Sequence, residues 1–296
     1  MSRLRPASIL VLLGLLLAAA RSPDLRNAEA GAQVPAAIPW TSLADGMDIA
    51  SLDLPRYGTG SDSALTILRI DPRQWELRLL SASATPGQEL LTARQWCERE
   101  GLMAAINAGM FATDGITHVG YLRCDEHVNN GQGNAYRSAA AFAPRSPDLP
   151  SFRIFDLDET SLEWLRERYG CLVQNLRLIK RPGENRWSHQ EREWSEAALG
   201  EDSHGRVLLI LSRIPFAMYD LNQLLLSLPI DLVSAQHLEG GPEAQLYVKV
   251  GRYEREWVGG YGGGFLMTDA SPSAWPIPNV LGIAPLDGPG RSGGGR

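Results

Sequence analysis

Short apolar segments with the alternation of β-strands follow one another in groups along this chain of 296 residues, with few helical stretches between them. One run covers residues 64–70, breaks at an Asp-Pro pair and resumes at 75–80, which predicts a hairpin or meander. A second pair, 197–200 and 206–212, flanks a turn at 202–205 and predicts another hairpin. Such grouping favours the α+β class, with a largely antiparallel or mixed β-sheet and a few packed helices in a single domain.

Three segments show helical spacing of apolar residues. The first covers residues 92–100, with Thr92 as its N-cap and Gly101 as its stop. The segments 160–169 and 219–228 carry leucines at a helical period. Further strands are predicted at residues 102–106, 115–122, 139–142, 171–179, 231–238 and 244–250. The charged stretch 181–194 between them is expected to be a long surface loop.

The N-terminus has the pattern of a secretory signal, because two arginines precede the apolar run 7–20. That run is shorter than the roughly 20 apolar residues of a membrane-spanning helix. We therefore expect residues 1–30 to be signal peptide and linker, 31–284 to be the folded domain and 285–296 to be a disordered tail. The mature protein is then exported, either periplasmic or secreted, and has no stable membrane span.

Charge and cysteine content exclude several kinds of partner. A formal net charge of −6 argues against nucleic acid. Three cysteines, Cys97, Cys124 and Cys171, allow one disulfide and leave one thiol, with a spacing that fits no zinc site. The histidines form no paired metal motif, and the only G-x-G-x-x-G lies in the tail. We expect no metal and no cofactor.

Two predicted strands end in a polar residue followed by glycines. The segment I-N-A-G-M-F, residues 106–111, carries Asn107, and the segment H-L-E-G-G-P, residues 237–242, carries Glu239. Glycine turns let the backbone approach a ligand closely, so the two segments suggest one site. Two alternatives stay open: Asn107 caps its own turn, and Glu239 is a solvated turn residue.

Six short motifs occur in a fixed order: I-N-A-G-M-F at 106–111, H-V-G-Y at 118–121, V-Q-N-L-R-L at 173–178, A-A-L-G-E-D at 197–202, H-L-E-G-G-P at 237–242 and P-N-V-L-G-I at 278–283. Together they resemble the boxes of the phosphodiester glycosidase family, which is related to the lysosomal uncovering enzyme and has an exported bacterial branch. The resemblance spans roughly residues 47–283.

The resemblance implies hydrolysis of a glycosyl phosphodiester, a sugar joined through its anomeric carbon to a phosphodiester, in envelope or extracellular polysaccharide metabolism. The partner is then a carbohydrate or glycosyl phosphodiester. An oxocarbenium-like transition state calls for a carboxylate, which assigns the catalytic roles to Glu239 and Asn107. The candidate substrate-binding residues are Gly109, Phe111, Gln174, Arg177, Gly240, Gly241 and Glu243.

The chain also departs from the family pattern at several positions. Glu239 replaces an Asp, Glu196 replaces an Arg, Pro242 and Glu243 replace Gly and Ser, and Leu176 and Arg177 replace Gly and Pro. A phosphate site that loses a cation and gains carboxylates binds anions less well, unless Arg177 or Lys180 compensates. The alternative function is a catalytically lapsed member that binds carbohydrate or an envelope partner.

Two further residues have two interpretations each. Gln174 either orients sugar or phosphate oxygens or satisfies backbone groups at a buried position. His237 lies two residues before Glu239, so the two share a face if the strand runs that far. His237 is then an acid or proton carrier, or it is a structural histidine.

Overall fold

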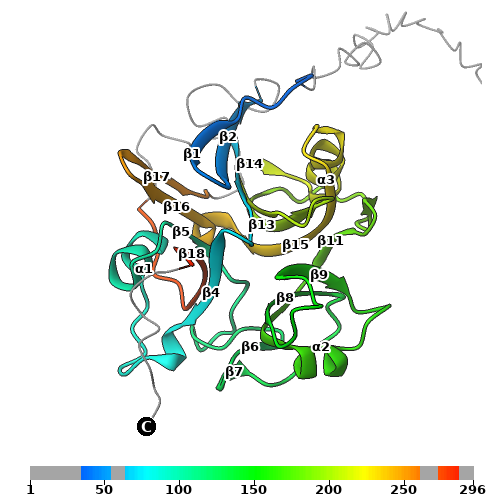
Figure 1. Ribbon diagram of the computed structural model, residues 1–296. Coiled ribbons are helices and arrows are strands. Elements are labelled where there is room, and N and C mark those ends of the chain that lie inside the picture. Colours follow the sequence, from blue (N-terminus) through cyan, green and yellow to red (C-terminus); the bar gives the residue numbers. More distant parts are fainter. Residues whose placement is uncertain (1–34, 55–63, 261–272, 287–296) are drawn as a thin grey trace, which may run out of the picture. The chain divides into compact units, whose positions relative to one another are not determined.

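The computed structural model describes residues 35–54, 64–260 and 273–286 (Figure 1). These residues belong to one compact unit, Val34–Arg296. The predicted signal segment 1–30 lies outside the described residues, as does residue 287 onward of the predicted tail. None of the described helices combines the length and apolar character needed to cross a lipid bilayer.

The described strands form three sheets, and every pairing between them is antiparallel. The eight-stranded sheet has the order β1 (Thr41–Ala44), β2 (Met47–Asp53), β3 (Ala64–Ile70), β14 (Val207–Phe216), β13 (Trp194–Asp202), β15 (Leu232–Gly240), β11 (Arg177–Lys180) and β12 (Glu184–Asn185).

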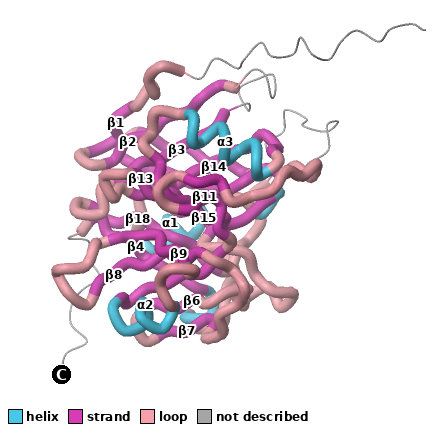
Figure 2. Tube along the Cα trace, turned by 90° about the vertical axis from the view of Figure 1, so that its right-hand side faces the viewer, coloured by secondary structure: helices cyan, strands magenta, loops and turns pink. Residues whose placement is uncertain are grey.

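The other two sheets have five strands each. One has the order β7 (His127–Asn130), β6 (Leu122–Cys124), β10 (Tyr169–Asn175), β8 (Ser138–Pro144) and β9 (Phe152–Asp156). The other has the order β17 (Tyr253–Val258), β16 (Gln245–Val250), β5 (Ala104–Asn107), β18 (Asn279–Pro285) and β4 (Trp75–Ser81). The described α-helices are α1 (Ala93–Glu100), α2 (Leu162–Arg168) and α3 (Met218–Ser227), and the short 3₁₀ turns are η2 (Ala82–Ala84) and η3 (Gly241–Glu243). Figure 2 shows that strands dominate the trace.

Each sheet turns one face to a shared core and the other to a helix. Leu209 of β14, Val173 of β10 and Ile106 of β5 lie together in the central cluster. The residues one position earlier on the same strands lie in separate clusters with α3, α2 and α1, respectively. Because side chains alternate across a strand, each sheet can bury both faces in this way. The α+β class with largely antiparallel sheets in a single domain is confirmed.

The two predicted hairpins have different outcomes. Strands β13 and β14 pair as expected, with Glu201 opposite Val207 at the turn. The segments 64–70 and 75–80 form β3 and β4, but the predicted pairing between them is wrong. β3 pairs with β2 and β14, and β4 pairs with β18 in another sheet. The turn at Asp71 carries the chain between sheets, and an apolar pattern cannot specify which partner a strand takes.

Helix α1 confirms its predicted ends. The Thr92 hydroxyl accepts from the Gln95 backbone N–H at 3.2 Å, and the Gln95 side chain accepts from the Thr92 N–H at 2.9 Å. This reciprocal capping box satisfies two backbone donors at the start of the helix. Gly101 follows with φ 66°, the left-handed conformation that ends many helices.

Two strand predictions are corrected. Residues 115–121 do not form a strand, because Asp114 Oδ1 accepts the N–H groups of Ile116 and Thr117 and closes a turn; the strand β6 begins only at Leu122. The predicted strand 171–179 is two strands, β10 and β11, which belong to different sheets. Leu176 lies at the break between them.

The cysteines form one disulfide and leave one thiol, as their number predicted. Cys124 and Cys171 form a disulfide between the neighbouring strands β6 and β10, and Cys97 is a buried free thiol on α1. Asp125 lies beside the disulfide, but neither sulfur is available there as a thiolate ligand.

Candidate active site at the ends of three strands

The ends of β5 and β15, from different sheets, are joined through Asn107. Its Nδ2 donates to the backbone carbonyl of Glu243 at 2.9 Å, and its Oδ1 accepts from the Gln245 N–H at 2.7 Å. The buried amide is therefore bonded at both ends to the segment that follows Glu239, at Glu243 of η3 and at Gln245, the first residue of β16. Asn107 does not cap its own turn in this structure; it positions a turn 136 residues away.

The end of β10 lies beside the residues that follow Asn107. Asn175 Nδ2 donates to the Ala108 carbonyl at 2.9 Å, one residue beyond Asn107. Next to it, the Leu176 carbonyl accepts from the backbone N–H of His237 at 2.9 Å. One strand end from each sheet thus converges here, which brings the motifs around residues 107, 175 and 239 together.

Glu239 is a half-buried carboxyl group near the end of β15. Its Oε1 accepts from the Gly240 N–H at 3.1 Å. Burial raises the pKa of Glu239 to about 7, with a further contribution from the Glu243 and Glu196 charges, and is opposed by His237 and by the Gly240 hydrogen bond. A carboxyl group with this pKa exists in both protonation states near neutrality, as an acid–base catalyst requires.

Behind Glu239 lies a buried pair that the sequence analysis did not combine. Glu196 Oε1 lies 2.6 Å from His237 Nδ1, and Glu196 Oε2 accepts from the Trp194 indole N–H at 2.9 Å. The Glu196 side chain is completely buried and that of His237 is 6% exposed. The only sequence signal for this pair is that each residue stands near a family box; their contact spans 41 residues.

The two members of this pair act on each other's pKa. Burial raises the pKa of Glu196, and the His237 charge only partly opposes this. Burial lowers the pKa of His237, but the Glu196 charge and hydrogen bond raise it by more, so the net shift is upward. An upward shift keeps a proton on the imidazole at a pH where a free histidine would have lost it.

The predicted glycines make room mainly for the protein's own side chains. A Cβ on Gly240 would lie 2.5 Å from the Trp194 ring, so only glycine lets the indole reach Glu196. Gly241 has φ +70°, which turns the chain into η3. Gly109 has no room for a Cβ either, because His118 and Asn175 pack against it.

Gln174 and Phe111 have contacts in the segments around residues 118–136. The Gln174 amide is bonded only to backbone groups: Oε1 accepts from Tyr121 and Asn134, and Nε2 donates to the carbonyls of Asn134 and Tyr136. These contacts match the interpretation of Gln174 as a buried residue that satisfies backbone. The half-buried Phe111 forms an isolated bridge with His118 at the start of the loop.

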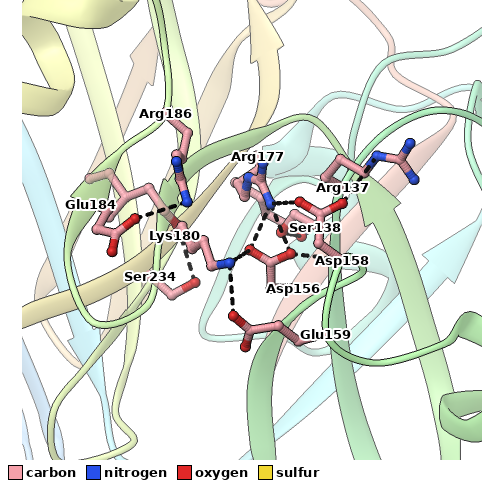
Figure 3. Close-up of polar contacts among 12 residues, drawn as sticks. Arg137, Ser138, Asp156, Asp158, Glu159, Arg177, Lys180, Glu184, Arg186 and Ser234 are labelled. Carbon is pink, nitrogen blue, oxygen red and sulfur yellow. Dashed lines mark hydrogen bonds and ion pairs between the residues drawn. The ribbon is translucent and has the colours of Figure 1, made fainter.

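Arg177 belongs to an ion-pair network between β11 and β9 (Figure 3). Its guanidinium lies 2.7 Å from both Asp156 and Asp158. Lys180 lies 2.7 Å from Glu159 and 3.7 Å from Asp156. The two cations that were expected to compensate for the lost family arginine therefore have carboxylate partners of their own, which are not Glu239 or Glu243.

This arrangement defines a class of protein: an antiparallel α+β protein with an acid-rich site at converging strand ends, whose central carboxyl group suits acid–base hydrolysis. Residues 100–284, more than half of the chain, match the family model described as phosphodiester glycosidase. The chain belongs to the phosphodiester glycosidase family. Membership supports a glycosidase-type function.

Solved structures show the same fold. The catalytic domain of zebrafish N-acetylglucosamine-1-phosphodiester alpha-N-acetylglucosaminidase, auto-inhibited by its pro-peptide, is 15% identical with a TM-score of 0.55; the match covers 80% of this chain and 82% of that one. A hypothetical protein from Synechocystis is 13% identical, also with a TM-score of 0.55, over 85% of this chain and 64% of that one. No curated protein matches the chain.

Proposed function

We propose that this protein is an exported hydrolase of glycosyl phosphodiester linkages, in which Glu239 is the catalytic carboxyl group. The observation that carries the proposal is the position of Glu239, a half-buried carboxyl group near the end of β15 that accepts from the Gly240 N–H and is followed by the turn that Asn107 holds. Burial there raises the pKa of Glu239 to about 7, and the residue lies within the part of the chain that matches the family. The zebrafish relative is named for a sugar 1-phosphodiester, and the proposed substrate contains that linkage.

The proposed reaction is attack of water on the anomeric carbon, with phosphate as the leaving group. In the proposed reaction Glu239, as carboxylate, takes a proton from water while the water oxygen bonds to the anomeric carbon and the bond from that carbon to the phosphate oxygen breaks. Asn107 acts by holding η3, so that Gly240, Gly241 and Glu243 keep their places around this carboxylate. Gln174 acts only through the backbone it supports.

Export is supported by two features of the chain. The apolar run 7–20 behind two arginines has the signal pattern. The Cys124–Cys171 disulfide suits an oxidising compartment such as the periplasm or the cell exterior. A role in envelope or extracellular polysaccharide metabolism fits that location.

A second candidate function is favoured by the excess of carboxylates. Glu196 and Glu243 lie close enough to Glu239 that both of their charges raise its pKa. Negative charge of this kind opposes an anionic phosphodiester. A family member that has lost catalysis and binds carbohydrate or an envelope partner would not have to overcome this repulsion.

The substitution Glu239→Gln tests the proposed function. We expect kcat for release of free sugar from a panel of sugar 1-phosphodiesters to fall by roughly 10²- to 10⁴-fold, with a smaller change in KM, because an amide cannot accept the proton. Glu201→Gln is the matched control, since Glu201 is another buried carboxyl group, on β13, bonded to Ile154 and Arg181. It should keep wild-type kcat.

A different result would favour the second function. If the wild-type protein releases no sugar from any member of the panel, but binds one of them equally well with and without Glu239→Gln, the hydrolase proposal is wrong. Calorimetric titration of the same panel measures that binding.

A further inference from the structure

His237 presents one ring nitrogen that the protein does not use. Nδ1 is occupied by Glu196 at 2.6 Å. Across the described part of the chain no hydrogen-bond partner faces Nε2, and this atom is not among the fully buried polar atoms that lack one. The imidazole is therefore fixed on one side and open on the other.

His237 and Glu239 lie two residues apart on β15, close enough for their charges to interact. The two residues are separated only by Leu238, which is buried in the central core, and each raises or lowers the other's pKa through its charge. Strand β15 has an irregularity here, with Ala198 opposite His237 and Ala197 opposite Glu239. Such a bulge redirects side chains at a strand end, which is common beside active sites.

The charges around the imidazole favour its protonated form. Glu196 on β13 and Glu239 on β15 both act on it, and Glu243 of η3 acts on Glu239. On β14 the buried Arg213 donates through Nε to the Val258 carbonyl. Among the described residues, His237 is thus held between carboxylates that favour its cationic form.

We propose that Glu196 holds His237 as an imidazolium whose Nε2–H binds the phosphate oxygen that leaves the sugar and transfers its proton to it. This inference rests on the proposed function and names the group that meets the substrate's phosphate. Glu196 is then a positioning residue and His237 a catalytic one.

The proton balance closes over one turnover. The anomeric carbon–oxygen bond breaks with its electron pair on the phosphate oxygen, which takes the proton from Nε2. Water supplies the new oxygen on the anomeric carbon and gives one proton to Glu239. The proton then returns from Glu239 to His237, directly or through water, and both groups regain their starting states.

The inference also accounts for the departure at position 196. The family resemblance places an arginine where this chain has Glu196, which alone would remove the cation that meets phosphate. Because Glu196 is bonded to His237, the positive charge in this chain lies on His237 of the neighbouring strand β15, and not at position 196. His237 then serves as a cation beside these carboxylates, and unlike an arginine it can also give up a proton.

Two substitutions and their combination test this. His237→Gln and Glu196→Gln should each lower kcat by about 10²-fold or more, the usual contribution of a positioned proton donor. The double variant Glu196→Gln with His237→Gln places two neutral amides in contact. A structural role would be restored by that contact, whereas proton donation would not, so we expect the double variant to regain stability in urea but not kcat.

The pH profile and NMR provide independent readouts. In wild-type protein the alkaline limb of kcat/KM should follow the titration of His237, read from its ring Cε1–H signal. Glu196→Gln should move both to lower pH. With a sugar fluoride, whose leaving group needs no protonation, the loss caused by His237→Gln should shrink at least tenfold. The exposed His204, changed to Gln, is the matched control and should alter none of these.

The outcomes separate this inference from the proposed function. If Glu239→Gln abolishes turnover while His237→Gln keeps the wild-type pH profile and kcat, the inference is wrong and the function stands. If the wild-type protein cleaves no substrate, the proposed function fails. The NMR titration then decides the Glu196–His237 pair alone: a lowered His237 pKa in Glu196→Gln supports it, and an unchanged one overturns it.

Discussion

Two groups of charged side chains contact different strands of the eight-stranded sheet and differ in how their charges balance. The network at β11 and β9 combines three cations with three carboxylates: Arg137, Arg177, Lys180, Asp156, Asp158 and Glu159. The cluster at the end of β15 has three carboxylates, Glu196, Glu239 and Glu243, with one histidine.

The pKa of a carboxyl group is shifted in opposite directions in the two groups. In the network, the Arg177 hydrogen bond lowers the pKa of Asp158. In the cluster, burial raises the pKa of Glu239 to about 7. In the network, each carboxylate has a cation beside it, so the carboxylates stay ionised and the ion pairs stabilise the fold. In the cluster, a carboxyl group with a raised pKa can hold a proton near neutral pH and transfer it. Charge content alone therefore does not identify a site; burial of a carboxyl group, with a smaller contribution from neighbouring carboxylates, distinguishes the cluster from the network.

The largest expected effect comes from breaking the network at its centre. Asp156 has a 6% exposed side chain and faces both Arg177 and Lys180. Asp156→Asn leaves these cations without their buried partner, so we expect the free energy of unfolding to fall by about 3–5 kcal/mol. Urea denaturation measures this loss, and kcat of the remaining folded protein should be unchanged.

Asp158→Asn is the matched comparison, because this carboxylate also contacts Arg177 but is 47% exposed. Its loss should be clearly smaller, since solvent screens the exposed charge. Equal losses for the two variants would contradict the view that the buried partner stabilises the network.

In the cluster, removal of a carboxylate should have the opposite effect and raise the free energy of unfolding. The pKa of Glu239 rises from 4.5 to about 7 on folding, so the folded state binds its proton more tightly and loses stability as pH increases from about 4.5 to 7. Glu239→Gln removes this loss. We expect the variant to match wild type near pH 4 and to exceed it near pH 8, by at most about 3 kcal/mol.

Urea denaturation of both proteins at these two pH values checks the sign. A variant that is less stable than wild type at pH 8 would show that the Glu239 carboxylate stabilises the fold, and the contrast between the two groups would not hold.

The smallest effect is expected at the edge of the network. Arg186 and Glu184 form an ion pair at 3.0 Å, with side chains 46% and 52% exposed. Glu184→Gln should change the free energy of unfolding by less than about 0.5 kcal/mol. A larger change in urea denaturation would mean that the network extends to the surface, beyond Asp156 and its buried neighbours.

Much of the local structure could be predicted from the chain. The start of α1 at Thr92 and its end at Gly101 depend on neighbouring backbone groups, and the β13–β14 hairpin depends on one turn. The prediction that Asn107 and Glu239 form one site agrees with the hydrogen bond from Asn107 to the Glu243 carbonyl, four residues after Glu239. The predicted pairing of β3 with β4 failed because alternation of apolar residues shows that a segment is a strand but does not specify which strand it pairs with.

The roles within the site could not be predicted in the same way. Asn107 was expected to face substrate, yet its amide bonds the backbone at residues 243 and 245. Arg177 was expected to meet phosphate, yet it pairs with Asp156. Glu196 was regarded only as a lost arginine, because nothing in its neighbourhood along the chain indicates a contact with His237.

The sequence by itself determined the α+β class, the ends of α1 and the motifs that carry the family resemblance, because those depend on residues close together in the chain or on their order. Only the tertiary structure decided which buried polar groups meet. Three sheets bring the ends of β5, β10 and β15 together, and burial there raises the pKa of Glu239. Desolvation and charge pairing act through space, so the surplus of carboxylates around one histidine exists only once the strands have paired.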